Sequence, residues 1–367
     1  PDPEFATLPI SMMVIGAAVG TVPAALTMRW LGRKAGMAVG IGIALIGAVI
    51  ACVAAINGNF WLFISGMICI GLNAAFTQQG RFIILENAET KDQQADGLSL
   101  ALLANLLAAV TGPQLGAYGK DVIQSPAGYA GSFMFAGIVL VLSLIALSAY
   151  QNKPAPVIKV ARSNRSLISI ARQPVFIIAA GSAAIGYGVM SLVMTATPIA
   201  MHKITGHPLQ LTTMVIQTHI VAMFLPSLIS GRLIKKGLTT SLLLGGLAIY
   251  ALVAIIGFNG VAVMHYWWAL LLLGLGWNLL FVTSTSLLPR AYNANEGFKA
   301  QALNDFLVFS SQAVAAFAAG WILFNMGWNS LLGIALASSL TWALCIGVLH
   351  LSTTNLTSLF IKKPHSK

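Results

Sequence analysis

A single histidine lies in the middle of a long apolar run, where ionisable side chains are rare. His219 stands within the run 209–231. Its imidazole titrates near neutral pH, so it could carry a proton or hydrogen-bond a solute. A core histidine bonded to a neighbouring helix would give the same pattern, and the sequence leaves both interpretations open. Asp305 is a second ionisable candidate, about one turn inside the run 301–325.

Uncharged polar and aromatic residues form the larger set of candidates for solute binding. Polar groups at mid-depth of an apolar helix point toward a cavity or a partner helix, and each alone is more often a helix contact than a ligand. Together they predict a cavity with amides, aromatic rings and almost no fixed charge, hence a neutral or weakly charged, partly apolar substrate. They are Gln217, Trp277, Asn278, Asn73, Gln78, Asn105, Gln114, Tyr187 and Gln312.

Catalytic and metal-binding patterns are missing from the sequence. There is no HExxH, no pair of acids in mid-run and no nucleophile motif, which argues against a membrane enzyme. The absence of a Walker A motif excludes only a pump that hydrolyses its own ATP. Cys52, Cys69 and Cys345 lie within apolar runs without a CxxC spacing. We therefore expect no disulfide, no metal and no cofactor.

The composition is that of a membrane protein. Of 367 residues, 57% are hydrophobic and only 8% are charged, too few to cover a soluble surface. The net charge of +11 would suggest nucleic acid as a partner of a soluble protein. Because the basic residues stand in short gaps between apolar runs, the orientation rule for membrane helices explains them better, and no nucleic acid is expected.

Eleven runs are long enough to cross the hydrocarbon, which takes about 20 residues of helix. Lipid offers no partners for bare backbone groups and the runs are too long for barrel strands, so the fold class is all-α and polytopic. The runs are 7–28, 37–56, 60–80, 97–119, 129–150, 174–200, 209–231, 239–259, 265–288, 301–325 and 328–350.

The basic residues orient these runs. When the gaps are assigned alternately to two sides, all 20 Lys and Arg residues except Lys120 and Lys203 fall on one side. This side is expected to be the cytoplasm. The prediction is a multi-pass protein of the cell inner membrane with a cytoplasmic C-terminus.

The longest polar gap, 151–173, carries two prolines and five basic residues and is expected to be a solvated linker. It divides the chain into an N-terminal bundle, 1–150, and a C-terminal bundle of six helices, 174–351. Residues 352–367 are expected to form a cytoplasmic tail.

The two bundles are related by a weak internal repeat, as in many secondary transporters. The offset of 203 residues places the first run on the seventh, so the run 174–200 has no partner in the first bundle. We expect a further helix before Pro1, which would give six helices in each bundle. The matched pairs are Pro23 with Pro226, Arg29 with Arg232, Arg33 with Lys236, Gly42 with Gly245, and Gly71 with Gly274.

Three motifs resemble the major facilitator superfamily. The stretch Arg29-Trp-Leu-Gly-Arg-Lys34 is similar to the basic loop between the family's second and third helices, and 231–237 is its weaker copy. The run 111–119, Thr-Gly-Pro-Gln-Leu-Gly-Ala-Tyr-Gly, resembles the Gly-Pro motif on the fifth helix of drug/proton antiporters. Its physical logic is bending and close helix contact, through Gly112, Pro113 and Gly116.

The resemblance implies a monomeric secondary transporter that moves a small amphipathic organic solute by alternating access in contact with membrane lipid. Coupling to protons is an expectation from the family rather than from these residues, because the sequence departs from the family's pattern at two places. Arg29 stands where the basic loop normally has an acid, and the run 60–80 lacks the buried arginine of the fourth helix, with Arg81 at its end.

The substrate and direction stay open. The stretches 215–226 and 274–282 resemble bacterial transporters of riboflavin and related small solutes, which favours vitamin-like uptake. The Gly-Pro motif favours efflux by an antiporter. A non-transporting sensor with a transporter fold is a further alternative, and an ATP-driven permease subunit fits the repeat poorly.

A conformational latch is expected at the cytoplasmic face. In the superfamily fold, the basic loop of one bundle meets the start of the other bundle's fifth helix. This would pair Arg29 with Asp305 and Arg232 with Asp96, each acid near a helix N-terminus where the dipole favours it. Ordinary surface charge is the alternative. A second cluster, Arg81 with Glu86 and Glu89, is expected to form an interfacial network.

Overall fold

Helices make up the architecture of the part of the chain that the computed structural model describes. No strand occurs in that part, as expected where backbone groups must pair within one segment. The described residues are 5, 7–78, 80, 91–150, 165–293 and 296–360.

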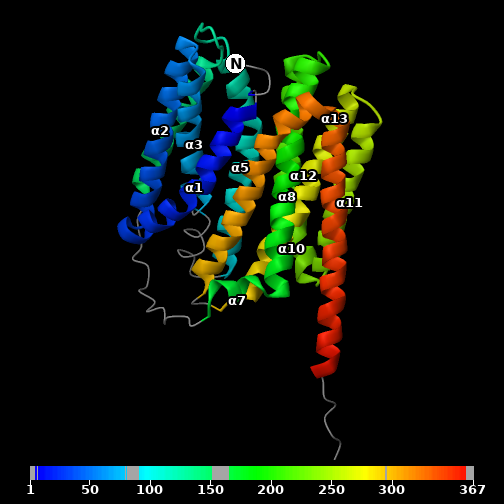
Figure 1. Ribbon diagram of the computed structural model, residues 1–367. Helices are drawn as coiled ribbons and strands as arrows, with labels where there is room; N and C mark the ends of the chain where they lie inside the picture. Colours follow the sequence, from blue (N-terminus) through cyan, green and yellow to red (C-terminus); the bar gives the residue numbers. More distant parts are fainter. Residues whose placement is uncertain are drawn as a thin grey trace, which may run out of the picture.

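The helices stand side by side in two groups (Figure 1). The first group is α1 (Leu8–Leu31), α2 (Arg33–Asn57), α3 (Phe60–Gln78), α5 (Lys91–Gly119) and α6 (Ala130–Ala149). After the short α7 (Leu167–Ala171), the second group is α8 (Pro174–Pro198) with its π-helical end η2 (Ile199–Ile204), α9 (Leu209–Phe224), α10 (Ser227–Lys235), α11 (Thr239–Phe258), α12 (Val263–Leu287) with the 3-10 turn η3 (Leu288–Ala291), and α13 (Gly297–Phe360).

Nine helical stretches among the described residues are long and apolar enough to cross a membrane. The last, Lys299–Leu349, has 51 residues, far more than the roughly 20 that one crossing requires. Gly327, with φ 82°, interrupts the helix there, between the predicted runs 301–325 and 328–350. Helix α5 covers the predicted run 97–119 but is not among the nine. The chain is thus an all-helical, polytopic membrane protein, and eleven crossings stay a prediction.

The packing inside the first group recurs inside the second. Helix α3 packs on α1 and on α2, as α12 packs on α9 and on α11. Likewise α2 packs on α6, and α11 on the second part of the chain's last helix, α13. The remaining helix, α8, packs on α12 and α13. These pairs follow the 203-residue offset seen in the sequence.

Glycines allow the closest of these approaches at matching positions. A Cβ added to Gly71 in α3 would collide with the carbonyl oxygen of Met13 in α1. A Cβ on Gly274 in α12 would lie 2.5 Å from the carbonyl oxygen of His219 in α9. Small residues let membrane helices meet backbone to backbone. Gly71 and Gly274 therefore have the same packing role, one in each group of helices.

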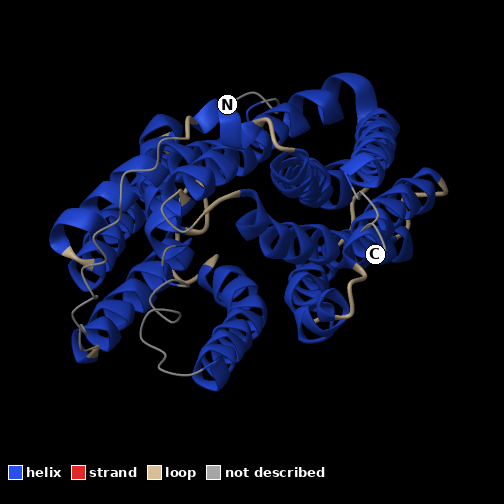
Figure 2. Ribbon diagram, turned by 90° about the horizontal axis from the view of Figure 1, so that it is seen from below, coloured by secondary structure: helices blue, strands red, loops and turns tan. Residues whose placement is uncertain are grey.

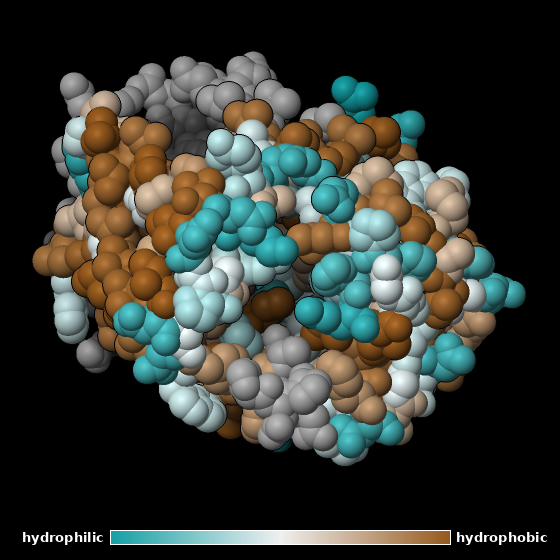
Figure 3. All heavy atoms as spheres, turned by 90° about the horizontal axis from the view of Figure 1, so that it is seen from above, coloured by the Kyte–Doolittle hydropathy of each residue, from teal (hydrophilic) through white to brown (hydrophobic). Residues whose placement is uncertain are grey.

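Among the described residues, the most extensive contacts between the two groups are those of α1 with α13 and of α5 with α9. Seen from below, the groups lie on either side of the middle of the molecule (Figure 2). From above, hydrophilic side chains surround a central hollow with a hydrophobic floor (Figure 3). The upper ends are those of the α5–α6 and α11–α12 connections, and α7 lies at the lower end (Figure 1).

The predicted run 209–231 is two helices rather than one. Helix α9 ends at Phe224 and α10 starts at Ser227, because Pro226 has no N–H to donate to the preceding turn. Asn278 from α12 bridges the break. Its Nδ2 donates to the Met223 carbonyl at 2.6 Å and to Ser227 Oγ at 2.5 Å. Its Oδ1 accepts from Ser230 Oγ at 2.9 Å.

Changing Gly71 to alanine tests the close approach of α1 and α3. Overpacking of this kind costs about 1–3 kcal/mol, so we expect the unfolding temperature of the purified protein in detergent to fall. The matched control is Gly42→Ala in α2, where no heavy atom lies within 4 Å of the added Cβ. Equal unfolding temperatures for the two variants would contradict the packing role.

Changing Asn278 to alanine tests the bridge across the helix break. Buried groups left without a partner cost about 1–3 kcal/mol, so thermal unfolding in detergent should begin at a lower temperature. Asn259→Ala is the control, since that exposed amide donates only to Ile255 within its own helix end. If the Asn278 variant melts like the Asn259 variant, the bridge does not stabilise the break.

Candidate solute site

Two predicted candidates meet across the two groups of helices. Gln114 Nε2 in α5 donates to Gln217 Oε1 in α9 at 3.3 Å. Gln217 Nε2 in turn donates to the carbonyl oxygen of Val110 at 3.1 Å. Glutamine side chains are neutral, so this described contact between α5 and α9 is polar but carries no charge.

Aromatic rings from α8, α9 and α12 form a cluster in the second group, which we call the aromatic cluster. Trp277 and Phe281 stack with centroids 4.9 Å apart and an interplanar angle of 18°. Tyr187 contacts both edge-on at 5.2 Å, and Phe224 meets Trp277 edge-on at 6.0 Å. Such edge-on and stacked pairs are the favoured geometries of aromatic contact.

His219 lies inside the second group rather than between the groups. It is fully buried, and its Nδ1 lies 2.8 Å from the carbonyl oxygen of Leu270 in α12, to which an Nδ1–H tautomer donates. Its Nε2 has no hydrogen-bond partner among the described residues. Gln217 stands two positions earlier, about 200° around the helix. The two candidates therefore point to opposite sides of α9, His219 to α12 and Gln217 to α5.

The remaining candidates are dispersed. Asn278 is engaged at the break between α9 and α10. Asn73 helps to line a cavity of about 510 Å³ between α2, α3 and α6, and its Oδ1 lacks a partner in the described part of the chain. Gln78 and Asn105 are exposed. Gln312 is partly buried, and its main-chain oxygen accepts from Ser191 Oγ at 3.2 Å.

The Gly-Pro motif makes its close contact one turn later than predicted. Pro113 lies within α5, but no described heavy atom comes within 4 Å of a Cβ built on Gly112 or Gly116. At Gly119 a Cβ would be 2.6 Å from the backbone of Ser132 in α6. Ser132 Oγ also donates to the Gly116 carbonyl at 2.6 Å. The packing role of Gly112 and Gly116 thus stays a prediction.

The predicted latch also stays a prediction. The side chains of Arg29 and Asp96 lie outside the described residues, as do the residues Arg81, Glu86 and Glu89. Arg232 is exposed. Asp305 is partly buried, and its Oδ1 accepts from Asn304 Nδ2 at 3.1 Å.

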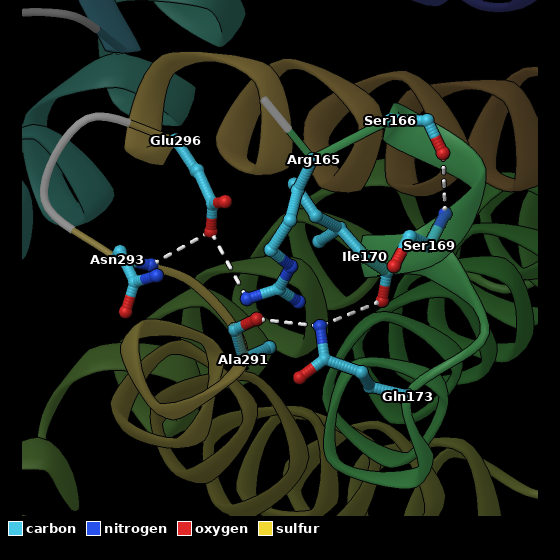
Figure 4. A network of polar contacts seen from close by, with 8 residues as sticks. All are labelled: Arg165, Ser166, Ser169, Ile170, Gln173, Ala291, Asn293 and Glu296. Carbon is cyan, nitrogen blue, oxygen red and sulfur yellow. Dashed lines mark hydrogen bonds and ion pairs between the residues drawn. The ribbon is translucent and has the colours of Figure 1, made fainter. Parts of the chain in front are cut away.

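A buried acid that the sequence analysis did not select ties the linker to the second group (Figure 4). Glu296, 2% exposed, pairs with Arg165 at 3.3 Å and accepts from the backbone N–H of Asn293 at 2.9 Å. Nearby, Gln173 Nε2 donates to the Ala291 carbonyl at 2.7 Å. Residues 165–173 are therefore bound to the loop before α13. Residues 166–169 and 172 are exposed, and 151–164 lie outside the described residues, so the linker stays a prediction.

Metal binding has no support in the described part of the chain, where no three His, Cys, Asp or Glu side chains gather closely enough to hold an ion.

Comparison with known proteins identifies the family. The model of the Major Facilitator Superfamily matches residues 1–316. The riboflavin transporter RfnT of Brucella anthropi is 36% identical over 335 residues, which cover 90% of this chain and 83% of that protein. Two uncharacterised MFS-type transporters of Bacillus subtilis, YdeG and YddS, are 30% and 28% identical, over 87% and 89% of this chain and 77% and 78% of their own lengths. The chain belongs to the major facilitator superfamily and is a secondary transporter, not an enzyme.

Proposed function

We propose that the chain carries riboflavin, or a closely related neutral ring compound, across the cell inner membrane by alternating access. The relative named a riboflavin transporter matches 90% of the chain at 36% identity. Riboflavin is uncharged near neutral pH and joins a flat three-ring system to a hydroxylated chain. It therefore needs aromatic surface and neutral hydrogen-bonding groups rather than a counter-ion.

The contact between Gln114 and Gln217 is the observation that carries this proposal. It places neutral amide groups between α5 and α9, the helices through which the two groups of helices meet. An amide offers both a donor and an acceptor, which suits the hydroxyl, carbonyl and ring-nitrogen groups of a flavin. A permanently charged solute buried there would be unpaired and costly to desolvate.

The moving parts are the two bundles, 1–150 and 174–351, acting within one monomer. The pairs α1 with α13 and α5 with α9 would serve as the surfaces on which the bundles rock. Because Arg165 is paired with Glu296, the end of the linker would move with the second bundle. The lower end in Figure 1, where α7 lies, is assigned to the cytoplasm from the distribution of basic residues.

Proton coupling is retained as part of the proposal. His219 is held within the second bundle and packs against α12, so it is placed to support the fold rather than to meet the solute. We assign the coupling to Asp305, an acidic side chain that is partly buried near the start of α13.

Uptake by the purified full chain in proteoliposomes tests the proposed function. We expect saturable accumulation of labelled riboflavin that increases under an imposed pH gradient. Excess unlabelled riboflavin should compete, because it occupies the same neutral site. Excess riboflavin 5′-phosphate should compete poorly, since its phosphate would have no counter-ion.

Empty liposomes and a proton uncoupler are the controls for leakage and for coupling. The proposal is wrong if the protein catalyses no riboflavin flux in either direction. Flux that is indifferent to the pH gradient would remove the coupling to protons alone. Flux seen only outward would identify the chain as an exporter and leave the proposed substrate unchanged.

A further inference from the structure

The aromatic cluster borders the space between the two bundles. Gln217 faces α5 across the bundles, and Phe224 follows it by seven residues, two helical turns along the same face of α9. Phe224 is partly buried and contacts Trp277 edge-on. The cluster therefore starts on the face of α9 that points toward the first bundle.

The ring stack continues from that face into α12. Trp277 and Phe281 are one turn apart and stack face to face, so each ring covers a face of the other and the pair forms an apolar wall. Trp277 is only 3% exposed, whereas Phe281 and Phe224 keep part of their surface open. A solute that enters between the bundles would thus meet the partly open rings first, with Trp277 behind them.

The indole nitrogen of Trp277 adds a hydrogen-bond donor to this apolar wall. Nε1 is buried and has no hydrogen-bond partner among the described residues. Buried tryptophan N–H groups normally find an acceptor, and the cost of lacking one is high where no water is present. The indole N–H groups of Trp267 and Trp342 both donate to hydroxyl oxygens, whereas Trp328 Nε1, outside the aromatic cluster, is like Trp277 Nε1 buried without a partner in the described part of the chain.

From these contacts we propose that the aromatic cluster is the subsite for the planar ring of the solute, and that Trp277 Nε1 donates to an acceptor on that ring. This inference rests on the proposed function and assigns the ring half of the molecule to the second bundle. A fused heteroaromatic ring packs against the partly open rings of Phe281 and Phe224, with an acceptor at its edge directed to Trp277 Nε1. The Gln114–Gln217 pair is left for the hydroxylated chain. The cluster thereby selects flat rings that carry carbonyl or ring-nitrogen acceptors.

Packing alone is the competing explanation, because large aromatic residues also fill helix cores. The two explanations differ in what they predict for ligand binding. A purely structural cluster would change thermal stability when altered but leave the dissociation constant of the solute unchanged. A ring subsite would change the dissociation constant even for variants that remain folded.

Quenching of riboflavin fluorescence by the purified full chain measures binding at this subsite, since an indole close to a flavin quenches its emission. Lumichrome, which has the ring system without the hydroxylated chain, should displace riboflavin, and ribitol should not. Phe281→Leu removes one ring of the wall, and Trp277→Phe keeps a ring but removes the N–H. Each should raise the dissociation constant about tenfold, the factor that corresponds to about 1.4 kcal/mol.

Trp268→Phe is the matched control, because Trp268 lies on the same helix but is 46% exposed and its ring contacts Trp267 rather than the cluster. It should bind riboflavin within about twofold of the unaltered chain. Wild-type affinity in both cluster variants, with the unaltered chain binding and transporting riboflavin, would overturn the subsite alone. If the unaltered chain neither binds nor transports riboflavin, the proposed function fails and the subsite fails with it.

Discussion

Hydrocarbon offers no hydrogen-bond partner to a peptide group, and the rest of this structure depends on that constraint. It requires a helix for every crossing, and it sets a condition on every place where a helix is broken. The break at Pro226 is bridged by Asn278, which reaches across from α12 to the Met223 carbonyl. In the first bundle, the matching Pro23 lies within the continuous helix α1, and Ala75 stands where the offset places Asn278. The repeat therefore conserves the packing, while the second bundle alone has the bridged break.

The same constraint explains the character of the contact between the bundles. Ion pairs buried there would be costly to form and costly to separate. Gln114 and Gln217 instead form neutral hydrogen bonds, each with a net worth of about 1 kcal/mol. Contacts of this strength are weak enough to break and re-form in the rocking motion proposed above. The described ion pair between the partly exposed Arg165 and the buried Glu296 instead joins the end of the linker to the second bundle.

The sequence was sufficient for the features that depend on length, hydropathy and spacing. Apolar runs predicted the helices, and the pairs at constant offset predicted that Gly71 and Gly274 hold matching places. The sequence was less informative about where each side chain points, because the position of a residue in a helix does not reveal which neighbouring helix its side chain faces. His219 was the most prominent candidate and is enclosed in the second bundle, whereas Gln217, two residues away, reaches α5.

Other parts of the site could not be found from residue type alone. Phe224 and Phe281 complete the aromatic cluster, yet phenylalanine is common in any membrane helix and carries no signal of its own. Glu296 stands in a polar connection, where an acid normally faces water; its burial depends on Arg165, more than a hundred residues away in the chain. In the run 209–231, by contrast, Pro226 is a residue type that predicts an interruption of the helix.

The most direct test of two bundles that rock about a shared solute is a pair of distance measurements by electron spin resonance. Spin labels at Asp121 and Asn259 report on the upper ends of the bundles, and labels at Leu31 and Lys299 report on the lower ends, in a background without the three native cysteines. On addition of riboflavin, one distance should lengthen while the other shortens. If both distances stay unchanged, or both change in the same direction while riboflavin is bound, the account of alternating access is contradicted.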